Sequence, residues 1–412
     1  MKCRFCSTTI DDPELDNVFV DLGTAPPSNA FLGATALKEP EIHFPLKLLT
    51  CPGCLLVQVD EVQPYTNLFT SDYVYYSSYS RSWLEHAERF VAKATSRLNL
   101  DATSLVVEIA SNDGYLLQYV AERQIPCVGI EPTMGTALAA RSKGIETEAE
   151  FFGLKFACDF AARRGKADLI IANNVLAHVP DLNDFVAGMA CALNTDGTIT
   201  IEFPHLQQLV SQRQFDTIYH EHFSYFSFHT VRSILAKHRL RIWDVETLQT
   251  HGGSLRVWAS HSKSDRVETE AVSRKLFEEA SAGMLEIGYY RGFQAQADKV
   301  KNELLCFLLG AHNDRRRIAG YGAAAKGNTL LNYAGVRSDL LPYVADASPH
   351  KQGRYLPGSR IPVVSEKRIL CERPDLILIL PWNLRDEIEE QLEYVRDWGG
   401  RFVTAVPQLV VI

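Results

Sequence analysis

Two pairs of cysteines near the start of the chain restrict its fold more than any other feature. Cys3 and Cys6 form one Cys-x-x-Cys pair, and Cys51 and Cys54 form a second. Each pair places two sulfur atoms on one side of a tight loop, and four thiolates are common ligands of a tetrahedral structural zinc ion. Because four cysteine ligands leave no open position for water or substrate, we expect one zinc ion that organises a small module and takes no part in catalysis.

The remaining cysteines and the first residues bear on the cellular compartment. The start of the sequence, Met1 to Cys6, has no apolar signal core, so we expect a cytoplasmic protein. Unpaired cysteines in the reducing cytosol usually behave as small apolar residues. We therefore predict that the scattered cysteines are buried in hydrophobic cores: Cys127, Cys158, Cys191, Cys306 and Cys371.

Composition narrows the possible partners. The 412 residues include 42 Lys and Arg against 50 Asp and Glu, which gives a net charge of −8, and there is no long basic run. Nucleic-acid binding proteins usually carry a basic stripe, so we expect no nucleic-acid partner. No run approaches the roughly 20 apolar residues of a membrane span, so we expect no membrane contact. The length exceeds what one hydrophobic core normally holds and predicts two or three domains.

Strands and helices alternate through the middle of the chain. Short apolar runs indicate buried strands at residues 105–110, 127–130, 167–172 and 198–203. Helices are expected at residues 82–98, near 115–123, and at 136–142. This alternation is typical of a doubly wound parallel sheet. Two more strands, 241–245 and 254–258, are predicted on either side of the Gly252-Gly253 turn.

A second alternating region follows a long polar helical stretch that runs through Leu309. Its strands are predicted at residues 317–320, 343–346, 376–380 and 402–405. The fold class is therefore α/β in three parts. We expect a small zinc-binding module over 1–75, a central doubly wound, Rossmann-like domain over 76–250, and a smaller C-terminal α/β domain over 251–412. The boundary between the last two is defined only to within about ten residues, around 245–260.

The end of the first parallel strand carries a loop suited to a small cofactor. Small and acidic residues occur together from Glu108 to Gly114, and Glu131 closes the next strand. An acidic residue at that place typically accepts both hydroxyls of a ribose. The loop lacks the tight G-x-G-x-x-G of a dinucleotide site, which favours S-adenosylmethionine, a cofactor with a ribose and no phosphate. The alternative is an ordinary strand-to-helix turn with a solvated carboxylate.

Two histidine-containing segments are candidates for catalysis. Tyr219-His220-Glu221-His222 is a dense group of ionisable residues, and its two histidines are too close in sequence to form a helical H-E-x-x-H zinc motif. A histidine beside a carboxylate and a phenol can serve as a general base. His178 lies beyond the end of the third core strand, where ligands bind in open α/β sheets. The alternatives are a hydrogen-bonded aromatic core around the first segment and a structural role for His178.

A glycine-rich loop, Gly320 to Gly327, follows the first strand of the C-terminal region. Backbone donors and Lys326 are available there for a diphosphate. The spacing differs from the G-x-x-x-x-G-K-[ST] of a P-loop, and a simple tight turn is the alternative reading.

Taken in order, these motifs resemble the three-domain sugar C-3 methyltransferases that use S-adenosylmethionine on nucleotide-linked 4-keto deoxysugars. The resemblance also includes Leu22-Gly23-Thr24-Ala25-Pro26, the segment Asp72 to Ser78, and His251-Gly252-Gly253-Ser254. It implies that the four paired cysteines bind zinc. It also implies that His222 is the general base, supported by pocket residues Tyr73, His178, Tyr219 and Glu221. Of these, we expect Glu221 to fix the orientation of the His222 ring.

The resemblance further implies where the ligands bind. The methyl donor would be held by residues after the first three strands, with Glu131 on the ribose: Glu108, Ala110, Asn112, Asp113, Gly114, Glu131, Pro132, Asn173 and Asn174. The sugar nucleotide would contact the C-terminal loop and one central residue: Tyr321, Gly322, Ala323, Lys326 and His251.

The expected reaction is methylation at C3 of a 4-keto-6-deoxysugar through an enolate. Thymidine diphosphate is the default carrier, with guanosine and cytidine diphosphates open, and we expect a monomer. A nicotinamide-dependent sugar-nucleotide oxidoreductase using the Gly320 loop, a zinc-ribbon interaction protein without catalysis, and methylation at oxygen or nitrogen are the alternatives.

Overall fold

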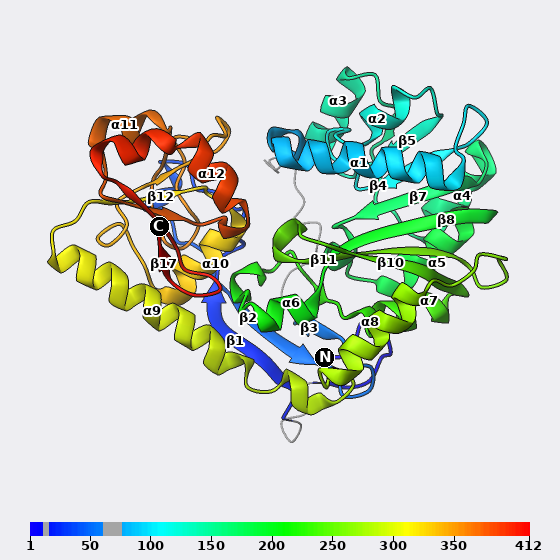
Figure 1. Ribbon diagram of the computed structural model, residues 1–412, viewed down its shortest axis with the longest axis horizontal. Helices are drawn as coiled ribbons and strands as arrows, with labels where there is room; N and C mark the ends of the chain where they lie inside the picture. The colour runs from blue at the N-terminus through cyan, green and yellow to red at the C-terminus, as the bar shows by residue number, and fades with distance from the viewer. Residues whose placement is uncertain (11–15, 61–75) are drawn as a thin grey trace.

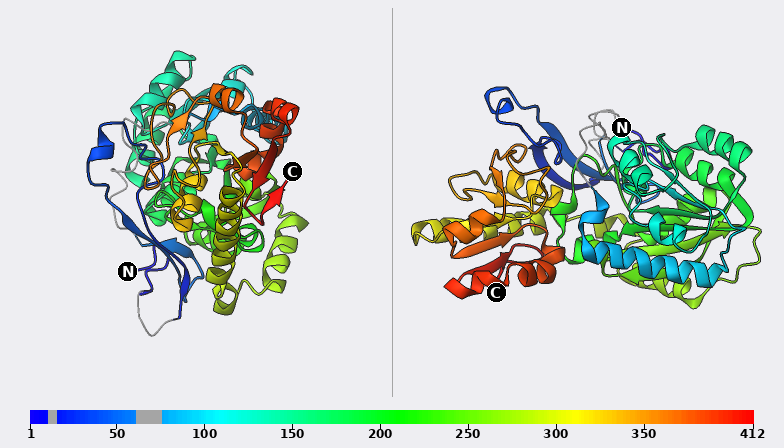
Figure 2. Two further views of the ribbon diagram at one scale, coloured as in Figure 1. Left: turned by 90° about the vertical axis from the view of Figure 1, so that its left-hand side faces the viewer. Right: turned by 90° about the horizontal axis from the view of Figure 1, so that it is seen from above.

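The computed structural model describes residues 1–10, 16–60 and 76–412, and contains three β-sheets (Figure 1). The C-terminal sheet lies on the left of that view and the central sheet on the right, with β1 and β2 at the base (Figures 1 and 2). No helix in the described ranges is both long and apolar enough to cross a membrane.

The N-terminal sheet is antiparallel, and its last strand comes from the middle of the chain. Its order is β1 (Val18–Ala25), β2 (Phe44–Thr50), β3 (Val57–Val59) and β9 (Ser224–Tyr225). The loop between β2 and β3 contains Cys51 and Cys54. Because β9 follows His222 by two residues, the zinc-binding module and the predicted catalytic segment share one sheet.

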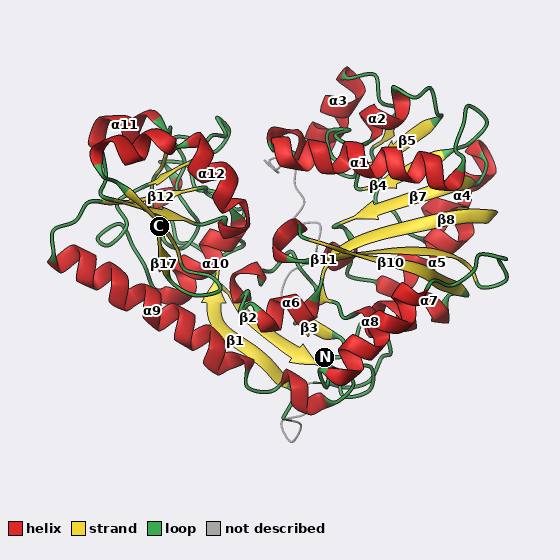
Figure 3. Ribbon diagram, in the orientation of Figure 1, coloured by secondary structure: helices red, strands yellow, loops and turns green. Residues whose placement is uncertain are grey.

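The central sheet has seven strands and confirms the predicted doubly wound fold (Figure 3). Five are parallel: β4 (Val106–Ile109), β5 (Cys127–Ile130), β6 (Thr147–Glu148), β7 (Ala167–Asn173) and β8 (Leu193–Pro204). An antiparallel pair, β11 (Ser254–His261) and β10 (Leu240–Leu248), continues the sheet beyond β8. The sheet therefore extends past residue 250, where we expected the central domain to end.

Helices cover both faces of this sheet, as apolar strands without alternation require. One face packs against α1 (Arg81–Leu98), α2 (Leu117–Ala121) and α3 (Met134–Ser142). The other packs against α4 (Leu154–Arg164), α5 (Leu182–Ala192) and α7 (Phe228–Lys237), while α6 (Leu206–Ser211) follows β8. Helix α1 begins where the Ser80 hydroxyl accepts a hydrogen bond from the Trp83 amide, and ends at Asn99 in the left-handed conformation.

The C-terminal region confirms a second, smaller α/β fold. The expected long helical stretch is two helices, α8 (Glu270–Ser281) and α9 (Phe293–Asn313). The sheet order is β14 (Val363–Val364), β13 (Val344–Ala345), β12 (Ile318–Tyr321), β15 (Leu376–Ile379), β16 (Arg401–Thr404) and β17 (Val410–Val411), and only β17 is antiparallel. Its helices are α10 (Ala325–Ala334), α11 (Lys367–Glu372) and α12 (Arg385–Gln391).

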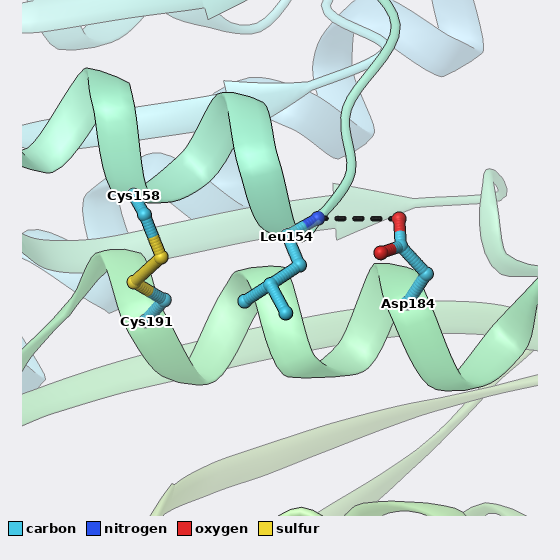
Figure 4. The surroundings of a disulfide bond; sticks show 4 residues. All are labelled: Leu154, Cys158, Asp184 and Cys191. Atoms are coloured by element: carbon cyan, nitrogen blue, oxygen red, sulfur yellow. Dashed lines mark hydrogen bonds between the residues drawn. A yellow bond between two sulfur atoms is a disulfide. The ribbon is translucent and has the colours of Figure 1, made fainter.

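The prediction that all five scattered cysteines are core thiols is wrong. Cys158 of α4 and Cys191 of α5 form a disulfide, with their Cα atoms 5.8 Å apart (Figure 4). Cys306 and Cys371 are exposed. The two helices approach closely because Gly188 lets α5 reach the backbone of Gly153, where a Cβ would lie only 3.0 Å away. Sequence spacing gave no sign that α4 and α5 place these sulfur atoms side by side.

Candidate active site

The four paired cysteines converge into one cluster that fits a zinc ion. Their sulfur atoms all lie within 4.8 Å of one another. Cys3 Sγ is 3.5 Å from Cys54 Sγ, and Cys6 Sγ is 3.4 Å from Cys51 Sγ. A tetrahedral zinc site with Zn–S bonds of about 2.3 Å needs sulfur atoms about 3.8 Å apart. The donor set and the spacing therefore suit a structural zinc ion, as the sequence predicted.

The loop after β4 has an unusual backbone for an ordinary turn. Ala110 and Asn112 have φ of 55° and 52°, and Gly114 has φ of 76°. Left-handed conformations at non-glycine residues are costly and are retained where the surroundings fix them, often at binding sites. The strained loop favours a binding function over the solvated-turn alternative.

Glu108 and Glu131 stand at the ends of neighbouring strands β4 and β5, and both are buried. Burial raises the pKa of Glu108 well above its ordinary value, although a hydrogen bond with Tyr115 opposes the rise. Glu131 accepts hydrogen bonds from the amides of Asn112 at 3.0 Å and Thr133 at 2.8 Å. These bonds fix the Glu131 carboxylate, whose oxygens are acceptors of the kind that ribose hydroxyls need. Pro132, which follows Glu131 in the sequence, is half-buried.

Several buried polar atoms around this edge have no hydrogen-bond partner among the described residues. They are Glu108 Oε2, Asn173 Oδ1 and both side-chain amide atoms of Asn174. Buried polar groups are almost always paired, so such a set marks a place where a ligand supplies the partners. A carboxylate oxygen, a carbonyl oxygen and an amide match the ammonium, hydroxyl and ring groups of S-adenosylmethionine. The residues present therefore fit this cofactor.

Asp113 has partners on only one of its carboxylate oxygens, because its buried Oδ1 has no hydrogen-bond partner among the described residues. Its Oδ2 accepts hydrogen bonds from the Ser78 hydroxyl and from Lys143 Nζ, the latter at 3.0 Å. The side chain thus ties the loop to the segment before α1 and to Lys143.

The predicted base, His222, is held by two contacts that define its protonation. Its Nδ1 lies 3.1 Å from the carbonyl oxygen of Thr217, and its Nε2 lies 2.8 Å from the Tyr219 hydroxyl. A carbonyl oxygen can only accept, so Nδ1 carries the proton, and Nε2 accepts from Tyr219. Burial and the nearby charge of His178 lower the pKa of His222 well below its ordinary value, so the ring is neutral at neutral pH.

His178 connects this base to the cofactor edge. It ends the 3-10 turn Leu176–His178, which follows β7 and Asn174. The His178 and His222 ring centroids are 4.6 Å apart in an edge-to-face arrangement, and the Phe223 amide donates to Ala177 O at 2.7 Å. Burial lowers the pKa of His178 to about 4. The structure therefore brings the two predicted histidines together beside the carboxyl end of β7.

The expectation that Glu221 orients His222 is wrong. Its two carboxylate oxygens accept hydrogen bonds from Asn29 Nδ2, each at 2.8 Å. Within the described part of the chain, the partners of the His222 ring nitrogens are Thr217 and Tyr219 instead. Adjacent residues in an irregular segment point in different directions, so proximity in sequence misled the prediction. Burial raises the pKa of Glu221 to about 7, although the Asn29 amide opposes the rise.

His251 and Lys326 approach the same region from other parts of the chain. His251 packs edge-on against Trp83 at 5.0 Å, and Trp83 stacks on Tyr115, the partner of Glu108. Burial, with a contribution from the charge of Lys326, lowers the pKa of His251 to about 4. The charges of His251 and Lys326 also lower the pKa of His222, so all three lie within electrostatic range.

Lys326 stands in the first turn of α10, and its environment is built by both large domains. Its Nζ donates to Asn383 Oδ1 at 2.8 Å and lies 4.8 Å from the centroid of the Trp382 ring. The Nε1 of Trp382 in turn donates to Asp216 at 2.7 Å. One turn later, the Thr329 hydroxyl donates to Ile218 O at 2.7 Å. Burial lowers the pKa of Lys326 to about 8. Helix α10 therefore packs directly on the segment that leads to His222.

The rest of the glycine loop does not supply the backbone donors that the sequence led us to expect. The amides of Gly322 and Ala323 already donate to Ala345 O and to the Asp346 carboxylate, at 2.8 and 2.7 Å. The Tyr321 hydroxyl is bonded to Glu366. Gly322 is required by packing, since a Cβ there would lie 2.4 Å from Pro381. Of this loop, only the first turn of α10 and Lys326 remain candidates for binding an anion.

Several contact residues were missed from the sequence. No sequence motif could have identified Thr217, Asn29 or Asp216 as contact residues. Trp382 could have been identified, because it follows the carboxyl end of the buried strand β15, where ligands bind in such sheets. Tyr73, also predicted for this site, lies outside the described residues.

Comparisons with known proteins agree with this organisation. Family models match a zinc binding domain at residues 3–69, a methyltransferase domain at 83–245 and a C-methyltransferase C-terminal domain at 249–407. The C-methyltransferase NovU of Streptomyces niveus is 34% identical over 411 residues, which is 100% of this chain and 96% of that protein.

Solved structures resemble only part of the chain. A magnesium protoporphyrin IX methyltransferase from Synechocystis is 16% identical, covering 43% of this chain and 79% of its own, with a TM-score of 0.34. An S-adenosylmethionine-dependent methyltransferase from Anabaena variabilis is 12% identical, covering 42% and 85%, with a TM-score of 0.36.

The sequence match to the Streptomyces niveus enzyme spans both chains almost completely, and the three family models follow one another in the order of the three sheets. The cysteine cluster and the unpaired polar edge of the central sheet supply the sites that such an enzyme needs. The chain therefore belongs to the C-methyltransferase family, as an S-adenosylmethionine-dependent enzyme with an N-terminal zinc-binding module.

Proposed function

We propose that this enzyme methylates carbon 3 of a 4-keto-6-deoxysugar carried by a nucleoside diphosphate, with thymidine diphosphate as the default carrier. The observation that carries the proposal is the neutral imidazole of His222, whose Nδ1 proton is engaged by Thr217 O and whose Nε2 faces the Tyr219 hydroxyl. A neutral imidazole held in one orientation is a suitable general base for removing a proton from carbon.

Carbon 3 of such a sugar is acidic because the neighbouring ketone accepts the charge. His222 Nε2 takes the C3 proton, the C–H electron pair becomes the C3=C4 bond, and the carbonyl π pair moves onto oxygen. The Tyr219 hydroxyl, by turning about its C–O bond, releases Nε2 and donates to the enolate oxygen instead. Removing one such donor typically costs about 10²- to 10³-fold in rate.

Bound S-adenosylmethionine supplies an electrophilic methyl group to the enolate carbon. The chain holds this cofactor through the unpaired atoms of Glu108, Asn173 and Asn174, and through Glu131 on the ribose. His178 lies between this edge and His222, which places the base next to the cofactor loops. Alignment of the reacting carbon with the methyl group then supplies much of the acceleration.

We place the nucleotide diphosphate at the first turn of α10. Lys326 contributes a positive charge there, and the helix N-terminus contributes backbone amides. Because α10 packs on the segment before His222, a sugar attached to this diphosphate reaches the base.

Product analysis tests the proposal. The enzyme would be incubated with S-adenosylmethionine and a 4-keto-6-deoxysugar linked in turn to thymidine, guanosine or cytidine diphosphate. We expect loss of the C3 proton signal and a new methyl singlet on a quaternary carbon. A methyl signal at the shift of an O-methyl or N-methyl group, with the C3 proton retained, contradicts the proposal.

A further inference from the structure

His251 has a strained backbone that needs support from its neighbours. It lies inside the 3-10 turn Thr250–Gly252 with φ of 54° and ψ of 22°, in the left-handed region. Histidine adopts this conformation at a cost, and a strained residue persists only where surrounding contacts over-determine it. Its ring is fixed by the edge-on contact with Trp83.

The ring nitrogens of His251 are available to a ligand. Among the described residues, no hydrogen bond engages them, although the side chain is half-buried. The pKa of about 4 keeps the ring neutral, so it offers one donor and one acceptor. A sugar hydroxyl, which both donates and accepts, matches that pair.

Several contacts hold the turn that carries His251, and one of them is the hydrogen bond from the Ser254 hydroxyl to Thr250 O at 2.9 Å. The Thr250 hydroxyl donates to Glu202 Oε1 at 2.9 Å, and Gln214 Nε2 donates to Gly252 O at 2.7 Å. A Cβ on Gly252 would lie 2.3 Å from Trp382 Cη2, so the turn is pressed against the C-terminal region. Of these contacts, the bond from Thr250 to Glu202 is the only one made by a side chain of the turn itself.

Glu202 is an unusually firm anchor. It lies two residues before the end of β8 and is fully buried. Arg256 donates to its Oε2 at 2.6 Å, and His86 Nε2 lies 2.9 Å from the same oxygen. Burial alone would raise its pKa, but His86 and Arg256 outweigh burial and lower it to about 2. Its carbonyl oxygen also accepts from the Asn174 amide at 2.7 Å. Glu202 thus connects the cofactor edge to the His251 turn.

We propose that Thr250 and Glu202 are positioning residues, which hold His251 in its strained conformation so that its imidazole binds a hydroxyl of the sugar nucleotide. The inference rests on the proposed function for the identity of the substrate. The hydrogen bond from Thr250 to Glu202 stabilises the turn without touching substrate, and its loss lets residue 251 relax away from the sugar.

Thr250→Val removes the hydroxyl at nearly constant shape, and Thr250→Ser restores it. The matched control is Thr269→Val, because the Thr269 hydroxyl also donates to a carboxylate of this sheet, that of Asp244, at 2.5 Å. We expect Thr250→Val to lower kcat/KM for the sugar nucleotide about tenfold, the usual effect of one hydrogen bond to a charged group. Affinity for S-adenosylmethionine should stay within twofold, and Thr250→Ser and Thr269→Val should behave like the parent enzyme.

A double-mutant cycle locates the effect. In a His251→Ala background, Thr250→Val should cause no further loss, because both changes remove the same contact. A tenfold loss that persists in that background, an unchanged Thr250→Val enzyme, or an equal loss in Thr269→Val each overturns the inference.

Crystal structures of the Thr250 variants separate this inference from the proposed substrate. If the parent enzyme leaves C3 of every 4-keto sugar unmethylated, the proposed function fails on its own. A positive φ at His251 in Thr250→Ser that is lost in Thr250→Val still supports the positioning role. A positive φ in both variants contradicts it.

Discussion

The Nδ1 proton of His222 is held by the carbonyl oxygen of Thr217 at 3.1 Å, which leaves Nε2 as the basic nitrogen. A carbonyl in this place fixes the tautomer as a carboxylate would, but it adds no charge that raises the basicity of the ring. Together with burial, this explains how His222 stays neutral near the charge of Lys326 and able to accept a proton.

Replacing the base tests the proposed chemistry directly. We expect His222→Ala to lower the rate of methyl transfer by about 10²- to 10⁴-fold, the usual contribution of a general base. Exchange of the C3 proton with deuterated solvent should fall equally, and binding of S-adenosylmethionine by calorimetry should not change. His229→Ala in α7 serves as the control. Near-normal exchange in His222→Ala would remove this residue from the role of base.

The pH dependence should report both His222 and Lys326. A base must be deprotonated, so the rate falls on the acid side only as pH drops through the pKa of His222, well below 6.5. Lys326 loses its charge as pH rises through about 8, which should weaken binding of the sugar nucleotide. Lys326→Met should therefore abolish the alkaline limb of kcat/KM. It should also move the acid limb of kcat to higher pH, because a neighbouring positive charge is removed.

Lys326→Arg is the matched control for that measurement. Arginine stays charged over the whole pH range in which the enzyme can be assayed. The alkaline limb of kcat/KM should therefore disappear from this pH range, while the acid limb of kcat stays where it is in the parent enzyme. Identical pH profiles for the parent enzyme and Lys326→Met would show that Lys326 lies too far from His222 and the diphosphate to affect either.

The elements and the metal ligands were readable from the sequence because both depend on local patterns. The apolar run at Cys127–Ile130 became β5 with the same bounds, and the predicted helix from Ser82 to Leu98 begins one residue earlier as α1. Two Cys-x-x-Cys pairs specify their own loops, so their convergence followed from residue type and spacing.

What the sequence could not show are contacts between distant segments. Asn29 and Glu221 are 192 residues apart in the sequence, and no pattern in the residues around either one indicates that they form a hydrogen bond. The disulfide between Cys158 and Cys191 depends on how closely α4 and α5 pack, which a single sequence does not reveal. The prediction for the glycine loop was wrong for a related reason, because the amides of Gly322 and Ala323 donate to Ala345 of β13 and to Asp346, which follows that strand.

Glu221 should make stability depend on pH in a recognisable way. Its folded pKa of about 7 lies above the ordinary value of 4.5, so the folded state binds more protons between these values. Stability from this group is present below pH 4.5 and is lost as pH rises to about 7, by up to about 3 kcal/mol. Glu221→Gln removes the titration.

Urea unfolding at several pH values measures this effect. The unfolding free energy of the parent enzyme, minus that of Glu221→Gln, should fall from pH 4.5 to 7 and stay level above it. A constant difference for Glu221→Gln would place the carboxylate in water rather than against Asn29.

Removing zinc should impair catalysis through the N-terminal sheet. Cys51 and Cys54 lie in the loop between β2 and β3, and β3 pairs with β9 directly after His222. The Tyr225 hydroxyl of β9 accepts from the Tyr219 amide at 3.3 Å, so the strand pairing also positions the donor to the enolate.

We expect a chelator or Cys54→Ser to release one equivalent of zinc, increase hydrogen exchange at residues 219–226 and lower kcat at least tenfold. Cofactor affinity should survive, because the ends of β4, β5 and β7 belong to the other sheet. Cys306→Ser, at an exposed thiol, controls for loss of a cysteine. Full activity and unchanged exchange in the zinc-free enzyme would show that the module does not support the base.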